Sequence, residues 1–83
     1  MKKLTLRQQE VLRFLDRYRR TYYCSPASRE IAAHFGWASQ QSAYNHLLAM
    51  ADKGYVTPVL SAAGNPRGYR LTARGRKSLQ EGS

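Results

Sequence analysis

The feature that most limits the fold is a pair of short helical segments separated only by residues 36–38. The first covers about residues 27–35, where apolar side chains recur at helical spacing. Gly36 follows it and can adopt the left-handed conformation that ends helices. Ser39 is a good N-cap for the second segment, which contains no Gly or Pro as far as residue 53. Helices joined by so short a turn cross steeply, so the pattern predicts a helix-turn-helix.

A longer helix is predicted before this pair, over about residues 5–22. Thr5 supplies a capping hydroxyl, and Gln8 supplies the reciprocal partner of a capping box. Apolar and aromatic side chains then recur on one side of the helix, and basic ones point to the other. The apolar stripe consists of Val11, Phe14, Leu15, Tyr18 and Tyr22, and the basic residues are Arg13, Arg17 and Arg20.

After Gly54 the pattern changes to strand, turn and strand. Residues 55–60 and 69–71 have the composition of short strands, and a turn rich in Gly, Asn and Pro separates them. Pro58 cannot donate a hydrogen bond to a sheet, so the first strand is expected at an edge. The segment therefore predicts a β-hairpin.

A short helix after the hairpin is left open. Thr72 can cap it, but Gly75 and the positive charges of its first turn oppose it. Residues 1–83 are expected to form a single domain, because a chain of this length has room for only one core. The predicted fold class is mainly α with a small β-hairpin: a winged helix-turn-helix, in which a three-helix bundle carries a two-stranded wing.

The charge balance points to a polyanionic partner. Fourteen Lys and Arg stand against five Asp and Glu, which gives a formal net charge of +9. Nucleic acid fits this charge. A membrane does not, because no apolar run approaches the roughly 20 residues that cross a bilayer and no signal peptide opens the chain. The expected partner is double-stranded DNA, and the expected location is cytoplasmic.

Catalysis and metal binding are not expected. Cys24 is the single cysteine, and it stands with His34 and His46 on separate elements without metal-site spacing. The acidic residues are scattered, so they offer neither a metal cluster nor a nucleophile with its base. We therefore expect no cofactor, no small-molecule substrate and no enzymatic activity.

Residues 39–53 present two faces when they are projected at about 100° per residue. The amides of Gln41 and Asn45 fall on the outward face, and each carries a donor beside an acceptor, which suits the N6 and N7 atoms of adenine in the major groove. Solvated amides are the alternative interpretation, and Tyr44 fits packing as well as base contact. The core face is predicted to hold Ala43, Leu47, Met50 and Ala51, and the outward face Gln41, Asn45, Leu48 and Asp52.

Further candidate contacts lie at helix ends and in the hairpin. Arg67 lies in a turn flanked by glycines, from which a guanidinium can reach phosphates or the minor groove. Arg76 and Lys77 follow as candidate phosphate contacts, and solvated side chains are the alternative for the helix ends. The predicted DNA contacts are Ser28, Arg29, Ser39, Gln40, Gln41, Ser42, Tyr44, Asn45, Lys53, Arg67, Arg70 and Arg74.

The aromatic residues are interpreted as packing residues. Phe14, Tyr18, Tyr22 and Phe35 recur at core spacing, and Trp37 fits packing at the turn between the two short helices. No multistranded sheet bearing aromatic side chains is predicted, which argues against the usual modules that bind single-stranded nucleic acid.

Several motifs resemble the amino-terminal DNA-binding domain of the LexA repressor family. The likeness covers about residues 1–60, and its most specific part is the run LTLRQQEV at residues 4–11. The segment from Tyr69 to Gly75 is similar instead to the strand-to-helix junction of MarR-type winged helices. The other LexA-like motifs are Glu30-Ile31-Ala32, Gly36, Ser39, His46-Leu47 and Lys53-Gly54.

The resemblance implies that the helix opening at Ser39 lies in the major groove, where Gln41, Ser42, Tyr44 and Asn45 would face bases. LexA proteins generally carry acidic residues where Tyr44 and Asn45 stand, so the operator of that family is not carried over. The chain also shows no carboxy-terminal peptidase domain. Neither self-cleavage nor that domain's mode of dimerisation is therefore expected.

These observations predict a sequence-specific DNA-binding transcriptional regulator, a repressor of bacterial or phage type. A homodimer on DNA is left open. The alternative is a winged helix used for protein interaction, such as a replication adaptor. Its support is Leu48 on the outward face of residues 39–53 and Leu12 at the edge of the apolar stripe.

Overall fold

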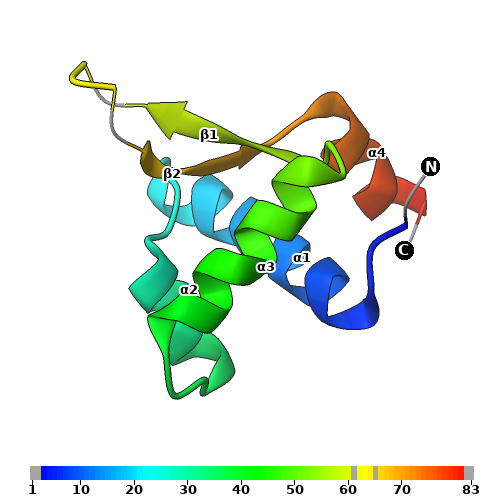
Figure 1. The fold of residues 1–83 in the computed structure, drawn as a ribbon. Helices are drawn as coiled ribbons and strands as arrows, with labels where there is room; N and C mark the ends of the chain where they lie inside the picture. Colours follow the sequence, from blue (N-terminus) through cyan, green and yellow to red (C-terminus); the bar gives the residue numbers. More distant parts are fainter. Residues whose placement is uncertain (1–2, 61, 65, 82–83) are drawn as a thin grey trace.

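The fold is a bundle of helices with a two-stranded sheet along one edge (Figure 1). A computed structural model describes residues 3–60, 62–64 and 66–81. In Figure 1, α3 crosses in front of α1, and α4 lies beyond the end of β2. The elements in chain order are α1 (Leu6–Tyr22), α2 (Ser28–Phe35), α3 (Gln40–Asp52), β1 (Val56–Leu60), β2 (Pro66–Leu71) and α4 (Ala73–Glu81).

The helix boundaries follow the caps that the sequence predicts. The Thr5 hydroxyl accepts a hydrogen bond from the Gln8 backbone N–H, and the Gln8 side-chain oxygen accepts one from the Thr5 N–H, both at 3.1 Å. These two bonds confirm the capping box. Gly36 ends α2 with φ at 71°, and the Ser39 hydroxyl accepts from the Gln41 N–H at 3.0 Å to start α3. The two helices of the predicted pair are therefore confirmed, joined by residues 36–39.

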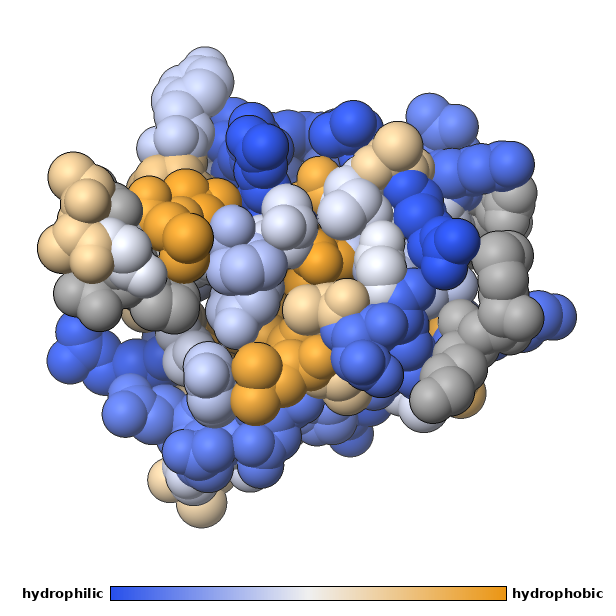
Figure 2. Space-filling view, turned by 45° about the horizontal axis from the view of Figure 1, so that its top comes forward, coloured by the Kyte–Doolittle hydropathy of each residue, from blue (hydrophilic) through white to orange (hydrophobic). Residues whose placement is uncertain are grey.

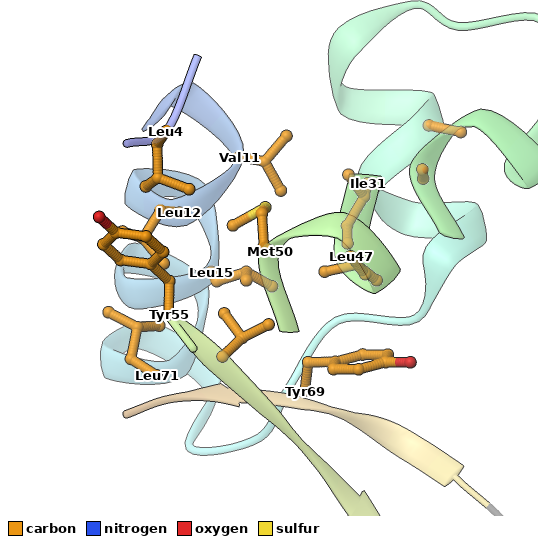
Figure 3. Packing of buried hydrophobic residues seen from close by; sticks show 13 residues of the cluster. Leu4, Val11, Leu12, Leu15, Ile31, Leu47, Met50, Tyr55, Tyr69 and Leu71 are labelled. Carbon is orange, nitrogen blue, oxygen red and sulfur yellow. The ribbon is translucent and has the colours of Figure 1, made fainter. Parts of the chain in front are cut away.

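The core gathers apolar side chains from α1, α2, α3 and both strands (Figure 3). Helix α3 contributes the face that the projection assigned to it, with Ala43, Leu47 and Met50 fully buried. Its other face is exposed. The buried apolar residues are Leu4, Val11, Leu12, Leu15, Ile31, Ala32, Ala43, Leu47, Met50, Tyr55, Val56, Tyr69 and Leu71.

The buried face of α1 is rotated relative to the predicted stripe. Leu12, expected at the edge, is 0% exposed, whereas Tyr22 is 62% exposed, so its assignment to the core is wrong. Phe14 and Tyr18 are half-buried instead of buried. The physical reason is that α1 packs on α3 and β2 through Leu12 and its neighbours, which leaves the aromatic residues at the margin of the core.

The aromatic side chains of α1 form a seam with α2. The Phe14 ring stacks on His34 with centroids 4.1 Å apart and meets Phe35 edge-on. The Tyr18 hydroxyl donates a hydrogen bond to the Glu30 carboxylate, and this bond, more than any other cause, raises the pKa of Tyr18 to about 12. These contacts hold α2 against α1 although the aromatic side chains stay partly exposed.

The hairpin is antiparallel, with Val56 opposite Leu71 and an irregularity between Val59 and Leu60. Tyr69 and Leu71 are buried, so the exposed Arg70 between them lies on the other face of the strand pair. The predicted turn residue Asn65 lies outside the described residues. The two-stranded wing is confirmed.

A close contact joins the wing to the loop between α1 and α2. The Ser25 hydroxyl donates a hydrogen bond of 2.6 Å to the carbonyl of Tyr69. Gly68 has φ at +155°, and a Cβ atom built there would lie 2.7 Å from the Ser25 Cβ. Glycine is therefore required where this loop crosses the strand.

The helix after the hairpin, which the sequence leaves open, is present as α4. The Thr72 hydroxyl caps it by accepting from the Gly75 N–H at 3.2 Å. Gly75, which counted against a helix, has a packing role: a Cβ atom there would lie 2.2 Å from the Tyr55 carbonyl oxygen. The low helix propensity of glycine is outweighed by the close approach that it permits. The complete arrangement is the predicted winged helix-turn-helix.

Across residues 3–60, 62–64 and 66–81, no helix has the length and apolar character that a membrane span requires.

Candidate nucleic-acid interface

The first two turns of α3 present a polar surface to solvent. Tyr44 lies in the second of these turns and is 37% exposed, so part of its ring packs against the protein and part is accessible to solvent. Figure 2 shows mainly hydrophilic side chains in the lower part of the view, where α2 and α3 lie, with smaller apolar patches between them. The exposed residues are the ones that the sequence singled out: Ser39, Gln40, Gln41, Ser42, Tyr44 and Asn45.

Two amides on this surface are bonded to each other. The Gln41 side-chain nitrogen (Nε2) donates a hydrogen bond of 3.0 Å to the Asn45 side-chain oxygen (Oδ1), one helical turn away. This bond leaves the oxygen of Gln41 as an acceptor and the nitrogen of Asn45 as a donor on two neighbouring amide groups. An acceptor next to a donor complements the adenine edge, where N6 donates and N7 accepts.

The N-terminus of α2 opens onto the same surface. Ser28 and Arg29 of α2 line a hollow of about 260 Å³ together with Gln40, Gln41 and Tyr44 of α3. Ala27 occupies the N-cap position of α2 and makes no side-chain capping bond. Among the described residues, no side chain caps the first N–H groups of α2, and a helix N-terminus of this kind favours an anion such as phosphate.

A second hollow links this surface to the wing. It measures about 150 Å³ and is lined by Ser28 of α2, Tyr44 of α3, and Gly68 and Tyr69 of β2, among others. Burial is the main cause that raises the pKa of Tyr69, and the neighbouring Tyr44 adds to it. The structure therefore brings the N-terminal parts of α2 and α3 into a single surface that borders β2. We call this surface the amide face: Ser28, Arg29, Ser39, Gln40, Gln41, Ser42, Tyr44 and Asn45.

Two of the predicted contacts lie at the other end of α3. The Lys53 ammonium donates to the Lys3 carbonyl at 3.0 Å and to the Gln8 side chain at 2.8 Å. Arg74 donates to the Lys53 carbonyl at 3.0 Å, and its guanidinium lies 6.0 Å from the centroid of the Tyr55 ring. These contacts join the C-terminus of α3 to the start of the chain and to α4, so both side chains have a structural role away from the amide face.

The wing arginines differ in position. Arg70 lies on the face of β2 opposite Tyr69 and lines a hollow with Arg19 and Arg76, not with α3. The side chain of Arg67 lies outside the described residues. Among the described candidates outside α3 and its N-cap Ser39, only Ser28 and Arg29 line a hollow with its N-terminal residues Gln40 and Gln41.

The element that the sequence analysis missed is the uncapped start of α2. Its signal is present in the sequence, since Pro26 fixes the helix entry and alanine follows where Ser, Thr, Asp or Asn would normally cap. Pro26 is also fully buried and lines the hollow next to the wing. An N-cap residue without a capping side chain, directly before the predicted contacts Ser28 and Arg29, indicates where an external hydrogen-bond acceptor can bind the first N–H groups of the helix.

Comparison with known proteins gives the same fold. A chain of the crystal structure of a S. aureus MepR–DNA complex superposes with a TM-score of 0.75 over 94% of this chain and 53% of that one. The two sequences are 18% identical, so the likeness concerns the fold.

Sequence relatives are LexA repressors. The repressor of Geobacter metallireducens is 42% identical over 78 residues, which cover 94% of this chain and 37% of that protein. The repressor of Actinobacillus succinogenes is 40% identical over 82 residues, which cover 99% of this chain and 38% of that protein. The chain thus spans over a third of the length of these relatives. The family model for the LexA DNA binding domain matches residues 1–68, and the chain belongs to this family.

Proposed function

We propose that this protein is a sequence-specific DNA-binding domain of a transcriptional repressor that places α3 in the major groove. The observation that carries the proposal is the amide face, where the N-terminal turns of α3 and the uncapped N-terminus of α2 line one hollow of about 260 Å³. The names of the sequence relatives and the DNA in the MepR complex support it. We also propose that residues 1–83 act as one domain, without catalysis.

The shape and the chemistry of α3 agree with this role. A helix with side chains is about 10–12 Å wide, which matches the roughly 12 Å width of the major groove. In our proposal, Gln41 and Asn45 bind base edges, since their mutual hydrogen bond already holds a donor beside an acceptor. The residues that flank this pair contact bases or phosphates according to their distance from the groove floor: Ser39, Gln40, Ser42 and Tyr44.

Phosphate binding falls to the neighbouring elements, because residues 40–52 contain neither Lys nor Arg. The first N–H groups of α2, the Ser28 hydroxyl and the Arg29 guanidinium lie beside α3 and suit one phosphate group. Arg67 remains a predicted contact of the wing. Lys53, Arg70 and Arg74 remain weaker predictions, since the structure places them away from the amide face.

The protein-interaction alternative loses part of its support. Leu12, one of its two leucines, is fully buried, and Leu48 is 43% exposed on an otherwise polar face. A single half-exposed leucine is ordinary on a protein surface. The amide face therefore favours DNA over a protein partner.

Selection of bound duplexes from a random pool tests the proposal, followed by anisotropy measurements of the winning duplex at several salt concentrations. We expect an enriched motif containing adenine. Its symmetry reports whether two copies bind together, which we propose as a homodimer on DNA. If about five phosphates are neutralised per domain, log affinity falls against log salt with a slope of roughly −4 to −5. The absence of enrichment with a slope near zero would overturn the proposal.

A further inference from the structure

Three arginines of α1 gather on the side of the molecule away from α3. Arg13, Arg17 and Arg20 are exposed and share one side of the helix, while Leu12 and Leu15 on its other side pack into the core. Because α3 packs into the same core from the opposite direction, the exposed sides of α1 and α3 point away from each other (Figure 3). These arginines therefore lie on the other side of the core from the amides of Gln41 and Asn45.

Helix α4 turns this row of arginines into a groove. Arg76 and Leu79 of α4 join the three arginines of α1 around a hollow of about 520 Å³. Leu79 packs partly into the core, so it contributes an apolar patch between the guanidinium groups. Asp16 is the one carboxylate among the described residues of this lining, and it forms an ion pair of 3.2 Å with Arg20.

Two further hollows continue the groove toward the wing. Arg76 also lines the next hollow, of about 370 Å³, together with Arg19 and Arg70. Arg19 and Arg70 in turn line a third hollow, of about 450 Å³. We call this continuous surface the arginine face; its six arginines are Arg13, Arg17, Arg19, Arg20, Arg70 and Arg76.

The arginine face ends in exposed apolar and aromatic side chains. Leu60 is 57% exposed and Val59 36%, and Figure 2 shows hydrophobic surface at the wing end of the sheet, at the left of the view. Tyr23 is 89% exposed and has φ at 60°, a left-handed conformation that bulky residues rarely adopt. All three line the third hollow.

We propose that the arginine face docks an acidic, amphipathic polypeptide segment. Among the described lining residues, six arginines and the single carboxylate of Asp16 make the face complementary to anions, and planar guanidinium groups pair with carboxylates through two parallel hydrogen bonds. The acidic side chains of the partner pair with the arginines of α1 and α4. Its apolar side chains contact Leu79 at one end, and Tyr23 and Leu60 at the other.

The composition favours a polypeptide over a second nucleic acid. Among the described residues that line the three hollows there are six arginines and no lysine. Arg and Tyr are enriched at protein interfaces while Lys is depleted, whereas phosphate tracks use both cations. A phosphate backbone also offers nothing that complements Val59, Leu60 and Leu79. Because Arg13, Arg17, Arg20 and Arg76 line a hollow without any residue of α2 or α3, a segment bound to them leaves the amide face accessible, and the inference does not depend on DNA binding.

The test measures binding of a fluorescein-labelled amphipathic helical peptide, with Glu on one side and Leu on the other, to the full chain. A peptide with Gln in place of Glu is the control ligand. The variants are Arg17→Glu in α1 and Arg76→Glu in α4. The matched control is Lys77→Glu, which makes the same charge change in α4 at a residue that lines none of the three hollows. Amide shifts of the labelled protein, measured by NMR, locate the peptide independently of any variant.

We expect Arg17→Glu and Arg76→Glu to weaken the acidic peptide about tenfold and Lys77→Glu less than about twofold. Amide shifts should follow α1, α4 and β2, with or without duplex DNA bound. Equal losses in Arg76→Glu and Lys77→Glu would overturn the inference, because they indicate charge alone. The inference would also be overturned if the Gln peptide bound as well as the Glu peptide, or if the peptide shifted amides at the start of α3. A loss of duplex affinity in Arg17→Glu and Arg76→Glu that Lys77→Glu does not share would overturn it as well, because it would indicate that this face binds nucleic acid.

Discussion

The amide face presents amides, hydroxyls and one arginine, whereas the arginine face presents six guanidinium groups. The formal net charge of +9 suggests a polyanion as partner, yet these six arginines lie away from the side chains with base-reading chemistry. Total charge sets the long-range field of the molecule, but local chemistry decides what each face recognises. The predictions below test whether the two faces act separately.

The largest effect is expected where α4 is attached. In Gly75→Ala, the new Cβ would lie 2.2 Å from the backbone oxygen of Tyr55, so α4 must shift or detach. We expect the free energy of unfolding, measured by urea denaturation, to fall by about 3 kcal/mol. Ser78→Ala on the same helix is the control and should change it by less than about 0.5 kcal/mol.

The same variant separates the faces. Arg76 and Leu79 belong to α4, so Gly75→Ala should weaken acidic-peptide binding at a temperature where the protein remains folded. Duplex affinity should stay within about twofold of the parent under the same conditions, since α4 contributes nothing to the amide face. A parallel loss of both activities would show that the faces are coupled through the fold.

The next effect concerns base recognition. Asn45→Ala removes the donor that the bond to Gln41 holds in place, and we expect a loss of about 1–3 kcal/mol on the selected duplex with little loss on random duplex. Competition anisotropy with both duplexes measures this difference. Thermal melting must first show that the variant is folded. Equal weakening on both duplexes would mean that α3 does not read bases in the proposed orientation.

A smaller effect compares one arginine from each face. Arg29→Ala and Arg17→Ala remove the same charge, so any long-range contribution to DNA affinity is shared. Because Arg29 lines the hollow with the start of α3, its loss should lower the salt slope of duplex binding by about one unit, whereas Arg17→Ala should leave the slope unchanged. Identical slopes in the two variants would contradict the assignment of phosphate contact to the amide face.

The smallest expected effect is a pH dependence of the free energy of unfolding, which arises from His46 of α3. His46 packs against Trp37, with ring centroids 4.9 Å apart; burial, and then the charge of Arg7, lower the pKa of its imidazole below 6.5. The unfolded chain therefore takes up this proton first as the pH falls, so the free energy of unfolding should decrease below about pH 6.5. An NMR titration of the imidazole checks the pKa. In Arg7→Gln the pKa should rise partway back; a pKa at or above 6.5 in the parent would refute the assignment.

Much of the fold could be predicted from local sequence signals. The capping box at Thr5, Gly36 after α2 and Ser39 before α3 each act within one helical turn, so the chain around them decides their geometry. The buried face of α3 also followed from its periodicity, because the opposite side of that helix is polar except for Leu48. On α1, apolar and aromatic residues occupy a wider arc of the helix, and periodicity alone could not predict which part of that arc is buried.

The candidate site divides in the same way. The polar residues of α3 were identified from their own helix, but their alignment with the start of α2 depends on how the two helices cross. The structural roles of Lys53 and Arg74 were not predictable, since both arise from contacts between residues distant in sequence. An arginine at a helix end looks the same in sequence whether it binds phosphate or its own protein.

The sequence by itself determined the helix-turn-helix, the hairpin and the outward amides of α3, because capping, turn chemistry and helical periodicity are local properties of the chain. Only the tertiary structure decided which face each charge occupies. Gly75 shows the physical reason: its helix propensity opposes α4, yet the absence of a Cβ allows α4 to approach the Tyr55 carbonyl and bring Arg76 beside the arginines of α1. Packing between distant segments, which no local signal encodes, thus placed the arginine face.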